Sequence, residues 1–447
     1  MDSKRYHKDC AVCSNYKDFE LPENIISSIH EVVLFVGSGV STESKAVFPD
    51  SFYSIICQEL NINPNKKIPF PKVMSLYCKK TGGRENLLNK IKERFDYFKA
   101  WPELYMQATD FHRELAIFPC IDKIVTTNWD DFIEIETNAT PFISDEDIIF
   151  WERPGKKVLK IHGSINSLGS IIATEEDYKR CYSNLQKGVI GSQLKLFLAK
   201  NIIIFLGYSF TDSDFQKIYK IIAKRMNALK KQAYIVTLDK QNDKFWRNKG
   251  LIPIRTDGVY FIHKLRKLFE VKGCILPMGN LNRVLVIKNH IGKAHDFTSK
   301  KYKHYHYPEI IYCLSYQDGI LHAFSYLLNK VHYGYSLCVN NLNNSIDVYE
   351  ELLKKYKKNW LENSYLNGYL KGLYYFKGAL LPKIKLSTIP IFPYYNAVTK
   401  EMYMNKNDFE KSLKHGNKNS SIRKKACAFI KEIKIGRDAV FHHIPRL

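Results

Sequence analysis

Five short apolar runs mark the first 270 residues of the chain, and each stops abruptly at glycine or polar residues. They have the length of strands: Glu31–Val36, Ile121–Thr127, Lys157–Ile161, Asn201–Leu206 and Ala233–Leu238. Strands that are buried on both faces show this continuous apolar pattern. Segments of helical spacing, such as Asp130–Glu136 and Asp212–Lys230, lie between some of the runs. The alternation predicts an α/β domain built on a Rossmann-like parallel sheet.

Residues 52–118 break this alternation and carry apolar side chains at helical spacing instead. Leu87, Leu88, Ile91 and Phe95 recur as they would on the buried face of a helix. We therefore expect a helical insert in this part of the chain. Sheets of this kind bind ligands at the carboxyl ends of their strands, where the strand order reverses, so we expect the insert to cover that crevice.

A domain boundary is predicted shortly after the helix-like segment His263–Phe269, where Pro277 and Gly279 break the pattern. The chain of 447 residues is also too long for one ordinary hydrophobic core. Single cores stop growing at roughly 250–300 residues. We therefore expect two domains, residues 1–274 and residues 275–447.

The second domain is predicted to be mixed α/β and strongly basic. Ile346–Tyr356 and Ser421–Ile433 have helical spacing, whereas the proline-containing Leu381–Tyr395 is typical of a loop or an edge strand. Residues 271–447 carry 28 Lys and Arg against 12 Asp and Glu, and residues 1–270 carry 40 against 33. Such an excess favours an acidic partner, above all nucleic acid, although a lysine-rich solvated surface explains it equally well.

Neither a secretory signal nor a membrane span is expected. Met1–Leu21 mixes charged residues and has no apolar core of the kind that a signal peptide needs. The most aliphatic runs, Val32–Val36 and Ile202–Leu206, are far shorter than the ~20 residues that cross a bilayer. Ten scattered cysteines lack the paired density of a disulfide scaffold. We expect a cytoplasmic protein.

Glycine and polar residues follow the predicted strands at the edge where such a sheet binds its ligands. The first strand runs into Gly37–Ser41, whose glycines suit a tight turn that exposes N–H groups to a pyrophosphate. Taken alone, a Gly-x-Gly sequence is more often a plain turn, and Thr42 replaces the third glycine of the dinucleotide fingerprint. Three further motifs follow strands in order: Thr126–Asp130, Lys160–Ser164 and Gly207–Asp214.

Together, these four ordered motifs resemble the sirtuin-like NADases of bacterial anti-phage defence. The resemblance covers about residues 30–270 and includes Phe111–Ala116, which leads into Asp122–Thr127, and Ile171–Tyr178 after the histidine motif. It implies a sirtuin-like fold and an NAD⁺ glycohydrolase that releases nicotinamide and ADP-ribose. It also implies a homo-oligomeric effector of abortive infection, which depletes NAD⁺ when it is triggered.

The resemblance assigns roles to residues of all four motifs. It implies that Asn128 orients the reacting ribose or a water, that His162 is the general base and that Asp130 meets the nicotinamide carboxamide. An imidazole titrates near neutral pH and an amide does not titrate, so both residue types suit these roles. The residues expected to bind NAD⁺ or to support its loops are Gly37, Ser38, Gly39, Ser41, Thr127, Asp130, Gly207, Ser209 and Asp212.

No metal is expected in this site. Sirtuin protein deacylases carry a four-cysteine zinc ribbon between the asparagine and adenosine motifs, whereas this chain has only Cys181 there. Near the N-terminus, His7, Cys10 and Cys13 have metal-like spacing, but a structural zinc needs four ligands and no second pair is evident. The missing ribbon favours NAD⁺ hydrolysis over protein deacylation.

Two other functions stay open at this point. One is a zinc-free deacylase that releases nicotinamide only when an acylated peptide is present. The other is a non-catalytic module that holds NAD⁺ or ADP-ribose while the second domain binds nucleic acid; the joint presence of Asn128 and His162 argues against it. The resemblance further implies that the second domain senses the trigger or binds a partner, such as nucleic acid, a short Argonaute or a hexameric ATPase.

Overall fold

The computed structural model divides into two compact units, the first covering the chain up to Lys267 and the second most of the chain from Leu268 onward. This division lies inside helix α13 (Gly258–Val271), so the domain limits at residues 274 and 275 stay a prediction. The structure describes residues 19–41, 43, 50–66, 68–208, 219, 231–238, 243–332, 337, 339–381, 388–395, 401–415, 421–437 and 439–445. The helix expected over Asp212–Lys230 lies outside the described residues, apart from Tyr219.

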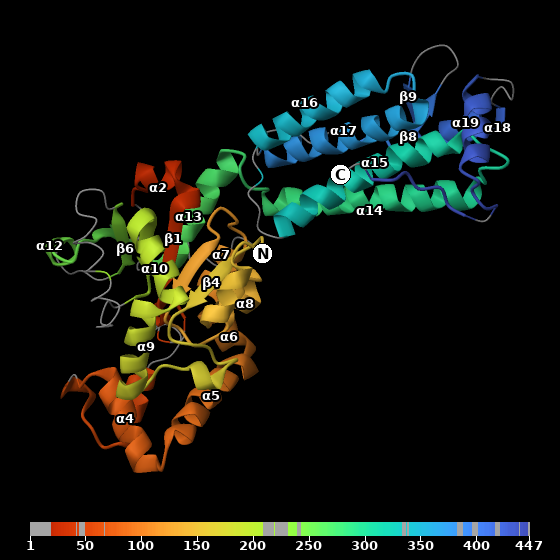
Figure 1. Cartoon of the computed structure of the whole chain (residues 1–447). Helices are drawn as coiled ribbons and strands as arrows, with labels where there is room; N and C mark the ends of the chain where they lie inside the picture. The colour runs from red at the N-terminus through yellow and green to blue at the C-terminus, as the bar shows by residue number, and fades with distance from the viewer. Residues whose placement is uncertain are drawn as a thin grey trace. The chain divides into compact units, whose positions relative to one another are not determined.

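A seven-stranded, fully parallel sheet forms the centre of the first unit (Figure 1). Its order is β3-β4-β2-β1-β5-β6-β7, which confirms the predicted Rossmann-like architecture. The strands are β1 (Val32–Val36), β2 (Lys123–Thr126), β3 (Thr140–Phe142), β4 (Lys157–Lys160), β5 (Ile202–Leu206), β6 (Ala233–Thr237) and β7 (Ile252–Arg255).

All five predicted strands are present, and two short ones were missed. The missed strands, β3 and β7, are the two edges of the sheet, and they contain Pro141 and Pro253. Proline lacks the N–H group that a central strand donates, so it is confined to edges and weakens the sequence signal of a strand. The central strands β1 and β5 are buried along their whole length, which explains their uniformly apolar sequences.

Helices cover the sheet of the first unit. Alternate residues of the strands form one core with α9 and α10, which contribute Leu185, Leu194 and Phe197 to it. The helices are α2 (Glu23–Ser27), α3 (Phe52–Glu59), α4 (Phe70–Thr81), α5 (Arg84–Ala100), α6 (Pro102–Ala108), α7 (Asp110–Ala116), α8 (Phe132–Thr137), α9 (Glu175–Lys187), α10 (Val189–Lys200), α12 (Asp243–Arg247) and α13.

The predicted insert is helical. It comprises α3 to α7, and its core includes Leu87, Ile91 and Phe95, three of the side chains that predicted it. The same core contains Phe132 of α8 and Ile171, which follows the histidine motif. The insert is therefore packed directly on two segments that border the carboxyl edge of the sheet.

The second unit is mainly helical. Its elements are α14 (Met278–Lys301), α15 (Ile310–His332), α16 (Val339–Lys355), α17 (Trp360–Leu380), β8 (Phe392–Tyr395), β9 (Glu401–Met404), α18 (Lys406–His415) and α19 (Ser421–Glu432). The expected mixed α/β domain is thus corrected: among the described residues, strands are limited to the antiparallel pair β8 and β9. Helices α15 and α17 are buried on most sides and lack a clear polar face, so their sequences do not reveal a helical stripe.

Glycines let α15 and α17 approach each other closely. A Cβ at Gly319 would lie 2.2 Å from the Tyr365 carbonyl oxygen, and one at Gly368 would lie 1.9 Å from that of Tyr316. Larger residues at these positions would force the helices apart. Side chains that flank these glycines are therefore held at fixed positions in the bundle.

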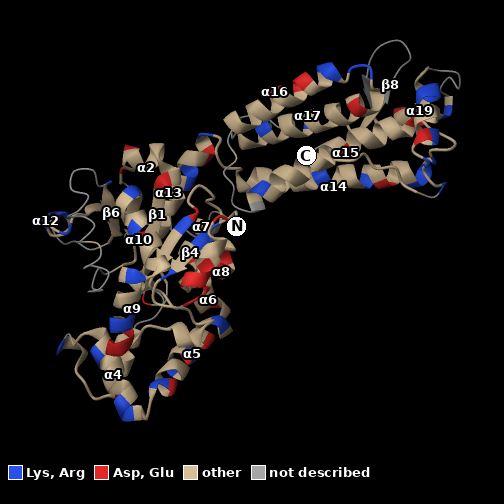
Figure 2. Cartoon of the chain, viewed as in Figure 1, with Lys and Arg blue, Asp and Glu red and all other residues tan. Residues whose placement is uncertain are grey.

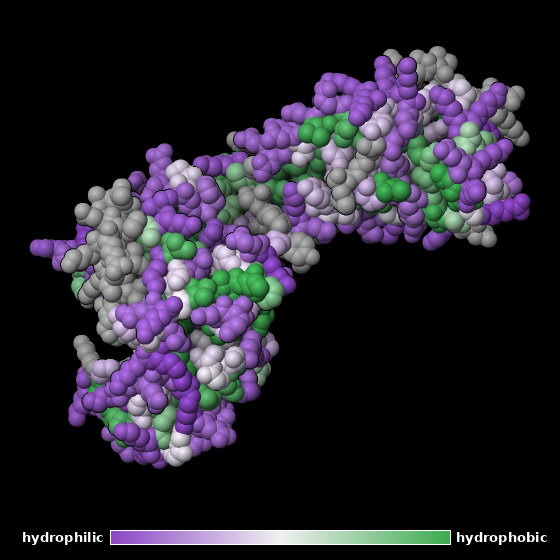
Figure 3. All heavy atoms as spheres, viewed as in Figure 1, coloured by the Kyte–Doolittle hydropathy of each residue, from purple (hydrophilic) through white to green (hydrophobic). Residues whose placement is uncertain are grey.

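Basic side chains are distributed along the helices of the second unit rather than gathered on one of them (Figure 2). Hydrophilic residues predominate on the face of this unit that Figure 3 presents. Within the part of the chain that the structure describes, no helix combines the length and the apolar character needed to cross a membrane.

Candidate active site

The loops after β1 and β5 meet where the strand order reverses. The chain places β2, β3 and β4 on one side of β1 and then crosses to β5 on the other side. The Gly37 N–H donates to the Leu206 carbonyl, and the Gly39 N–H donates to the Gly207 carbonyl, both at 2.9 Å. A Cβ at Gly37 would lie 2.5 Å from the Gly207 oxygen, and Gly207 has a left-handed φ of +59°. Glycine is therefore required where these loops touch.

This contact changes the role expected of the glycine turn. The N–H groups of Gly37 and Gly39 were expected to face a pyrophosphate, but they are bonded to the last residue of β5 and to the loop after it. Ser38 is partly exposed, whereas Ser41 is buried and its hydroxyl donates to the Ser38 carbonyl at 3.4 Å. The glycines thus let the two loops meet where the strand order of the sheet reverses. Phosphate binding by this turn stays a prediction.

Asn128 follows β2 and is buried, with 5% of its surface exposed. Its backbone N–H donates to the Thr126 hydroxyl at 2.9 Å, and that hydroxyl donates to the Val36 carbonyl at 2.8 Å. The Asn128 loop is therefore tied to the end of β1. Both polar atoms of the Asn128 side chain are buried without a hydrogen-bond partner among the described residues. A buried side-chain amide without a hydrogen-bond partner is rare in native proteins and is typical of a group that hydrogen-bonds to a bound ligand.

Asp130 lies two residues further on in the same loop and is also buried. Its Oδ1 accepts the Phe132 N–H at 3.3 Å, and its Oδ2 has no partner among the described residues. Burial raises the pKa of the Asp130 carboxyl to about 6, although the Lys160 ammonium opposes this shift. The Asp130 carboxyl can therefore gain or lose a proton near neutral pH, and its Oδ2 can bind a polar group of a ligand.

Lys160 is a buried cation whose role we did not anticipate. Its Nζ lies 2.9 Å from Oε1 of Glu134 and also donates to the Asp130 carbonyl oxygen. It ends β4 two residues before His162. A lysine at the start of the histidine motif was the available signal, and its contacts now explain how the Asp130 loop is held.

His162 is buried at the carboxyl end of β4, beside the Asn128 loop. Strand β4 pairs with β2, and the Ile161 N–H donates to the Thr126 carbonyl at 3.0 Å, so both loops begin at the same level of the sheet. The His162 ring packs edge-on against Tyr178, with 5.1 Å between ring centres. The segment predicted to follow the histidine motif thus folds back over it.

That returning segment is fastened to the insert. Asp177, the third residue of α9, forms a capping box with the N-cap residue Thr174. The Arg84 guanidinium of α5 pairs with Asp177 and donates to the Ile171 carbonyl at 2.6 Å. The insert therefore helps to hold the segment that contacts His162.

The insert also packs on the Asn128 loop, as expected. Trp129 contacts Phe52 of α3 and Phe70 of α4, with ring centres 6.2 and 6.0 Å apart. Its carbonyl accepts the Ile165 N–H at 2.7 Å, which joins the loops after β2 and β4. Aromatic side chains of the insert therefore lie against the residue between Asn128 and Asp130.

Three of the predicted site residues gain no defined role from the structure. Ser209 and Asp212 lie outside the described residues, and Thr127 is partly exposed without a contact that defines its role.

In contrast, Asp257 lies at this edge of the sheet and was not among the predicted site residues. It follows β7 and caps α13 by accepting the Val259 N–H at 2.7 Å, and a Cβ at Gly258 would lie 3.5 Å from a methyl group of Val40. The start of α13 therefore borders the glycine turn; its signal was an Asp-Gly pair before a helical pattern.

Part of the first unit matches a known protein family. Residues 122–254, which include the Asn128 and His162 motifs, match the family described as a SIR2-like domain. The curated relatives include the NAD(+) hydrolase ThsA of Enterococcus faecium, which is 26% identical over 41% of this chain and 38% of its own length.

Two further relatives carry the same name. The NAD(+) hydrolase ThsA of Cytobacillus dafuensis is 28% identical over 44% of this chain and 40% of its own length. The protein of that name from Acinetobacter baumannii (strain 532279) is 23% identical over 62% of this chain and 59% of its own length. The matches therefore span less than two thirds of each relative. The first unit therefore contains a segment, residues 122–254, that matches the SIR2-like domain family, and the chain is similar over part of its length to proteins named NAD(+) hydrolase.

Proposed function

We propose that this protein hydrolyses NAD⁺ at the nicotinamide–ribose bond and releases nicotinamide and ADP-ribose. The observation that carries the proposal is the buried amide of Asn128 at the carboxyl edge of the sheet, which has no hydrogen-bond partner in the described part of the chain. The name NAD(+) hydrolase of three relatives of the SIR2-like domain supports it.

The proposed reaction needs few groups from the protein. The C1′–N bond breaks with its electron pair moving to the nicotinamide ring nitrogen, which leaves an oxocarbenium-like ribose. A water oxygen then bonds to C1′, and its proton passes to the imidazole of His162 as general base. The Asn128 amide can both donate and accept, so it suits the orientation of a ribose hydroxyl or of the water.

The Asp130 carboxyl is proposed to bind the nicotinamide carboxamide. Its Oδ1 is already engaged by the Phe132 N–H, which leaves Oδ2 for the amide of the substrate. Binding there would satisfy a buried polar atom that the described residues leave unpaired.

We also propose the biological setting that the resemblance implied. The enzyme would act in anti-phage defence as a homo-oligomer that depletes NAD⁺ when the second unit, or a partner bound to it, detects the trigger. Tight control is required, because unrestrained cleavage would deplete the NAD⁺ of its own cell. The basic charge of residues 271–447 supports nucleic acid, or a protein that carries it, as that partner.

The direct test is to incubate the purified full chain with NAD⁺ and to separate the products by chromatography. The reaction is run alone, with single- and double-stranded nucleic acids, with an acyl-lysine peptide and with a chelator. We expect equal amounts of nicotinamide and ADP-ribose under an activating condition, at a rate that the chelator leaves unchanged.

Other outcomes would redirect the proposal. Nicotinamide release only with the acylated peptide would identify a deacylase. A cyclic product would replace hydrolysis by cyclisation. Tight NAD⁺ binding without turnover under every condition would contradict the enzymatic function and identify a binding module.

A further inference from the structure

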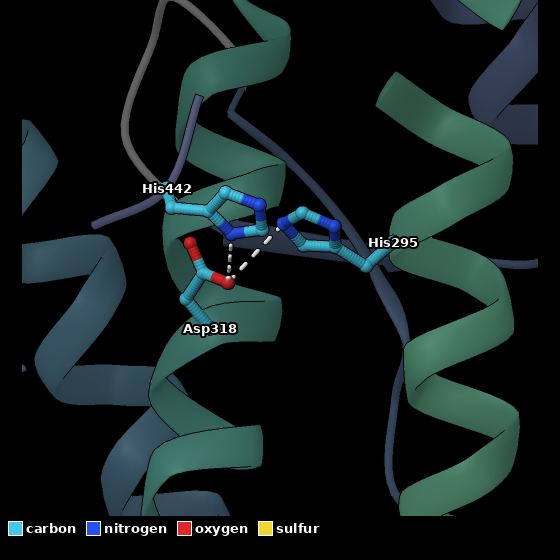
Figure 4. Close-up of side chains that lie close together, drawn as sticks. All are labelled: His295, Asp318 and His442. Atoms are coloured by element: carbon cyan, nitrogen blue, oxygen red, sulfur yellow. Dashed lines mark hydrogen bonds and ion pairs between the residues drawn. The ribbon is translucent and has the colours of Figure 1, made fainter. Parts of the chain in front are cut away.

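Three side chains from distant parts of the chain meet inside the second unit (Figure 4). His295 comes from α14, Asp318 from α15 and His442 from the C-terminal segment after α19. Oδ1 of Asp318 lies 3.1 Å from Nε2 of His295 and 3.3 Å from Nδ1 of His442. One carboxylate oxygen therefore faces two imidazole nitrogens.

The cluster has a buried side and an open side. The side chains of His295 and Asp318 are 4% and 3% exposed, whereas that of His442 is 63% exposed. Although Nε2 of His295 lies close to the carboxylate, it forms no hydrogen bond of acceptable geometry among the described residues. A buried polar nitrogen is thus only partly satisfied, beside a histidine whose side chain is mostly exposed.

From this geometry we propose that His295, Asp318 and His442 bind a divalent transition-metal ion of the Zn²⁺ class. Imidazole nitrogen and carboxylate oxygen are ligands that such ions prefer. A tetrahedral site with bonds of roughly 2.0–2.1 Å has ligands about 3.3–3.4 Å apart. The observed separations of 3.1 and 3.3 Å match that spacing. Three protein ligands leave the fourth position to a water or to a bound molecule.

One movement is needed for binding. The rings of His295 and His442 are stacked, with centres 4.7 Å apart and planes 9° apart, whereas the lone pair of each nitrogen lies in its own ring plane. One ring must turn so that both lone pairs point at a single ion. The ring of His442 is the one with room to turn, because its side chain is mostly exposed.

Neighbouring contacts hold the central ligand in place. The second oxygen of Asp318 accepts the His443 N–H at 2.8 Å. The His443 ring stacks on Tyr365 with centres 4.1 Å apart, and its Nε2 lies 3.6 Å from Glu362. Asp318 also precedes Gly319, where α15 and α17 touch. Outer contacts of this kind orient metal ligands and strengthen binding.

The proposal departs from the expectation that the protein contains no metal. That expectation had two grounds: the first domain lacks the cysteines of a zinc ribbon, and His7, Cys10 and Cys13 near the N-terminus lack a fourth ligand. These three N-terminal residues lie outside the described residues. The new ligands are separated by 23 and 124 positions, so no local motif marks them. A metal here would fasten the C-terminal segment to α14 and α15.

The test uses the full chain after dialysis against a chelator. Co²⁺ is titrated and followed by its visible d–d absorption, and Zn²⁺ is titrated by calorimetry and by thermal melting. The main variant is His442→Ala, because this exposed residue can be removed without opening the core. His290→Ala, an exposed histidine of α14, is the matched control. Asp318→Asn, checked for folding by circular dichroism, is the second variant.

We expect the parent and His290→Ala to bind the same number of Zn²⁺ equivalents and to melt at higher temperature with the metal. His442→Ala should bind this ion at least ~100-fold more weakly, since even outer-shell changes cost 10- to 100-fold. Asp318→Asn should lose the same equivalent. If the parent binds no Zn²⁺ or Co²⁺, or if His442→Ala binds both ions as tightly as the parent, the cluster is a metal-free latch and the proposal is wrong. Neither result depends on NAD⁺ cleavage.

Discussion

The buried amide of Asn128 has no hydrogen-bond partner among the residues that the structure describes, and a buried amide left in that state costs about 1–3 kcal/mol of stability. Native proteins tolerate such a cost where a group is reserved for a ligand. We therefore predict that Asn128→Ala leaves the melting temperature unchanged or raises it while NAD⁺ cleavage falls at least ~10²-fold. Asn89→Ala, an exposed asparagine of α5, is the control and should change neither quantity.

His162→Ala is expected to lower NAD⁺ cleavage by at least ~10²-fold as well, because the general base is lost. The control is His30→Ala, since this histidine is exposed and lies before β1. Cleavage is measured by nicotinamide release under activating conditions, with folding checked by circular dichroism. A folded His162→Ala protein that cleaves NAD⁺ at the parental rate would remove this residue from the mechanism.

The Asp130 carboxyl makes stability depend on pH. Its pKa is raised from 3.8 to about 6, chiefly by burial, because the folded state favours the protonated carboxyl. The contribution of this group to the free energy of unfolding is therefore fully present below about pH 4 and is lost as the pH rises through about 6. Asp130→Asn keeps the acceptor for the Phe132 N–H and has no charge to bury. It should be more stable than the parent at pH 7, by up to about 3 kcal/mol, and equally stable near pH 4.

This difference is measured by urea unfolding of the parent and variant across that pH range. Glu103→Gln, on the exposed surface of α6, serves as the control for removal of a carboxylate. A stability difference between Asp130→Asn and the parent that does not change with pH would show that Asp130 is not a buried, titrating group.

At the level of elements, the loops after β1 and β5 depend on glycine because their backbones touch. A Cβ at Gly37 would lie 2.5 Å from the Gly207 oxygen, whereas one at Gly169 has no atom within 4 Å. We predict that Gly37→Ala destabilises the protein by about 1–3 kcal/mol and abolishes NAD⁺ binding, because the added methyl group must push the loops after β1 and β5 apart. Gly169→Ala should be harmless.

Urea unfolding and calorimetric titration with NAD⁺ test this pair of glycine variants. Wild-type NAD⁺ affinity in Gly37→Ala would mean that the contact between the two loops is not needed for the site. Equal losses in both variants would mean that glycine-to-alanine changes are harmful for a reason other than this clash.

On the scale of the whole molecule, the second unit supplies most of the net positive charge. Lys354, Lys355, Lys357 and Lys358 are exposed at and after the end of α16, and Lys354 is 2.7 Å from Glu351. We predict that changing all four lysines to glutamate weakens nucleic-acid binding and activation together, while NAD⁺ affinity stays unchanged. The acidic partner would then face like charges instead of opposite ones.

Binding of the full chain to nucleic acid, measured from low to moderate salt, tests this surface. The logarithm of the affinity should fall with the logarithm of salt concentration, by about 0.9 for each neutralised phosphate on duplex DNA or about 0.7 on single strands. Binding that is absent, or that is indifferent to salt and to the four substitutions, would leave these lysines as an ordinary solvated surface.

The sequence by itself determined the parallel sheet, the helical insert and the motifs at the strand ends. These features are local: a buried strand needs a run of apolar residues, and a ligand edge needs polar residues directly after it. The edge strands β3 and β7 escaped detection because their prolines weaken the strand pattern. Helices α15 and α17 escaped it because burial on most sides removes the polar face that marks a helix.

Only the tertiary structure decided which groups are satisfied and which distant residues meet. The sequence could not show that the N–H groups of Gly37 and Gly39 donate to the end of β5 and the loop after it, or that the Asn128 side chain has no hydrogen-bond partner among the described residues. Nor could it place His442 beside Asp318, 124 positions away. Burial and hydrogen bonding depend on contacts between segments far apart in the chain, and no local pattern of residues records those contacts.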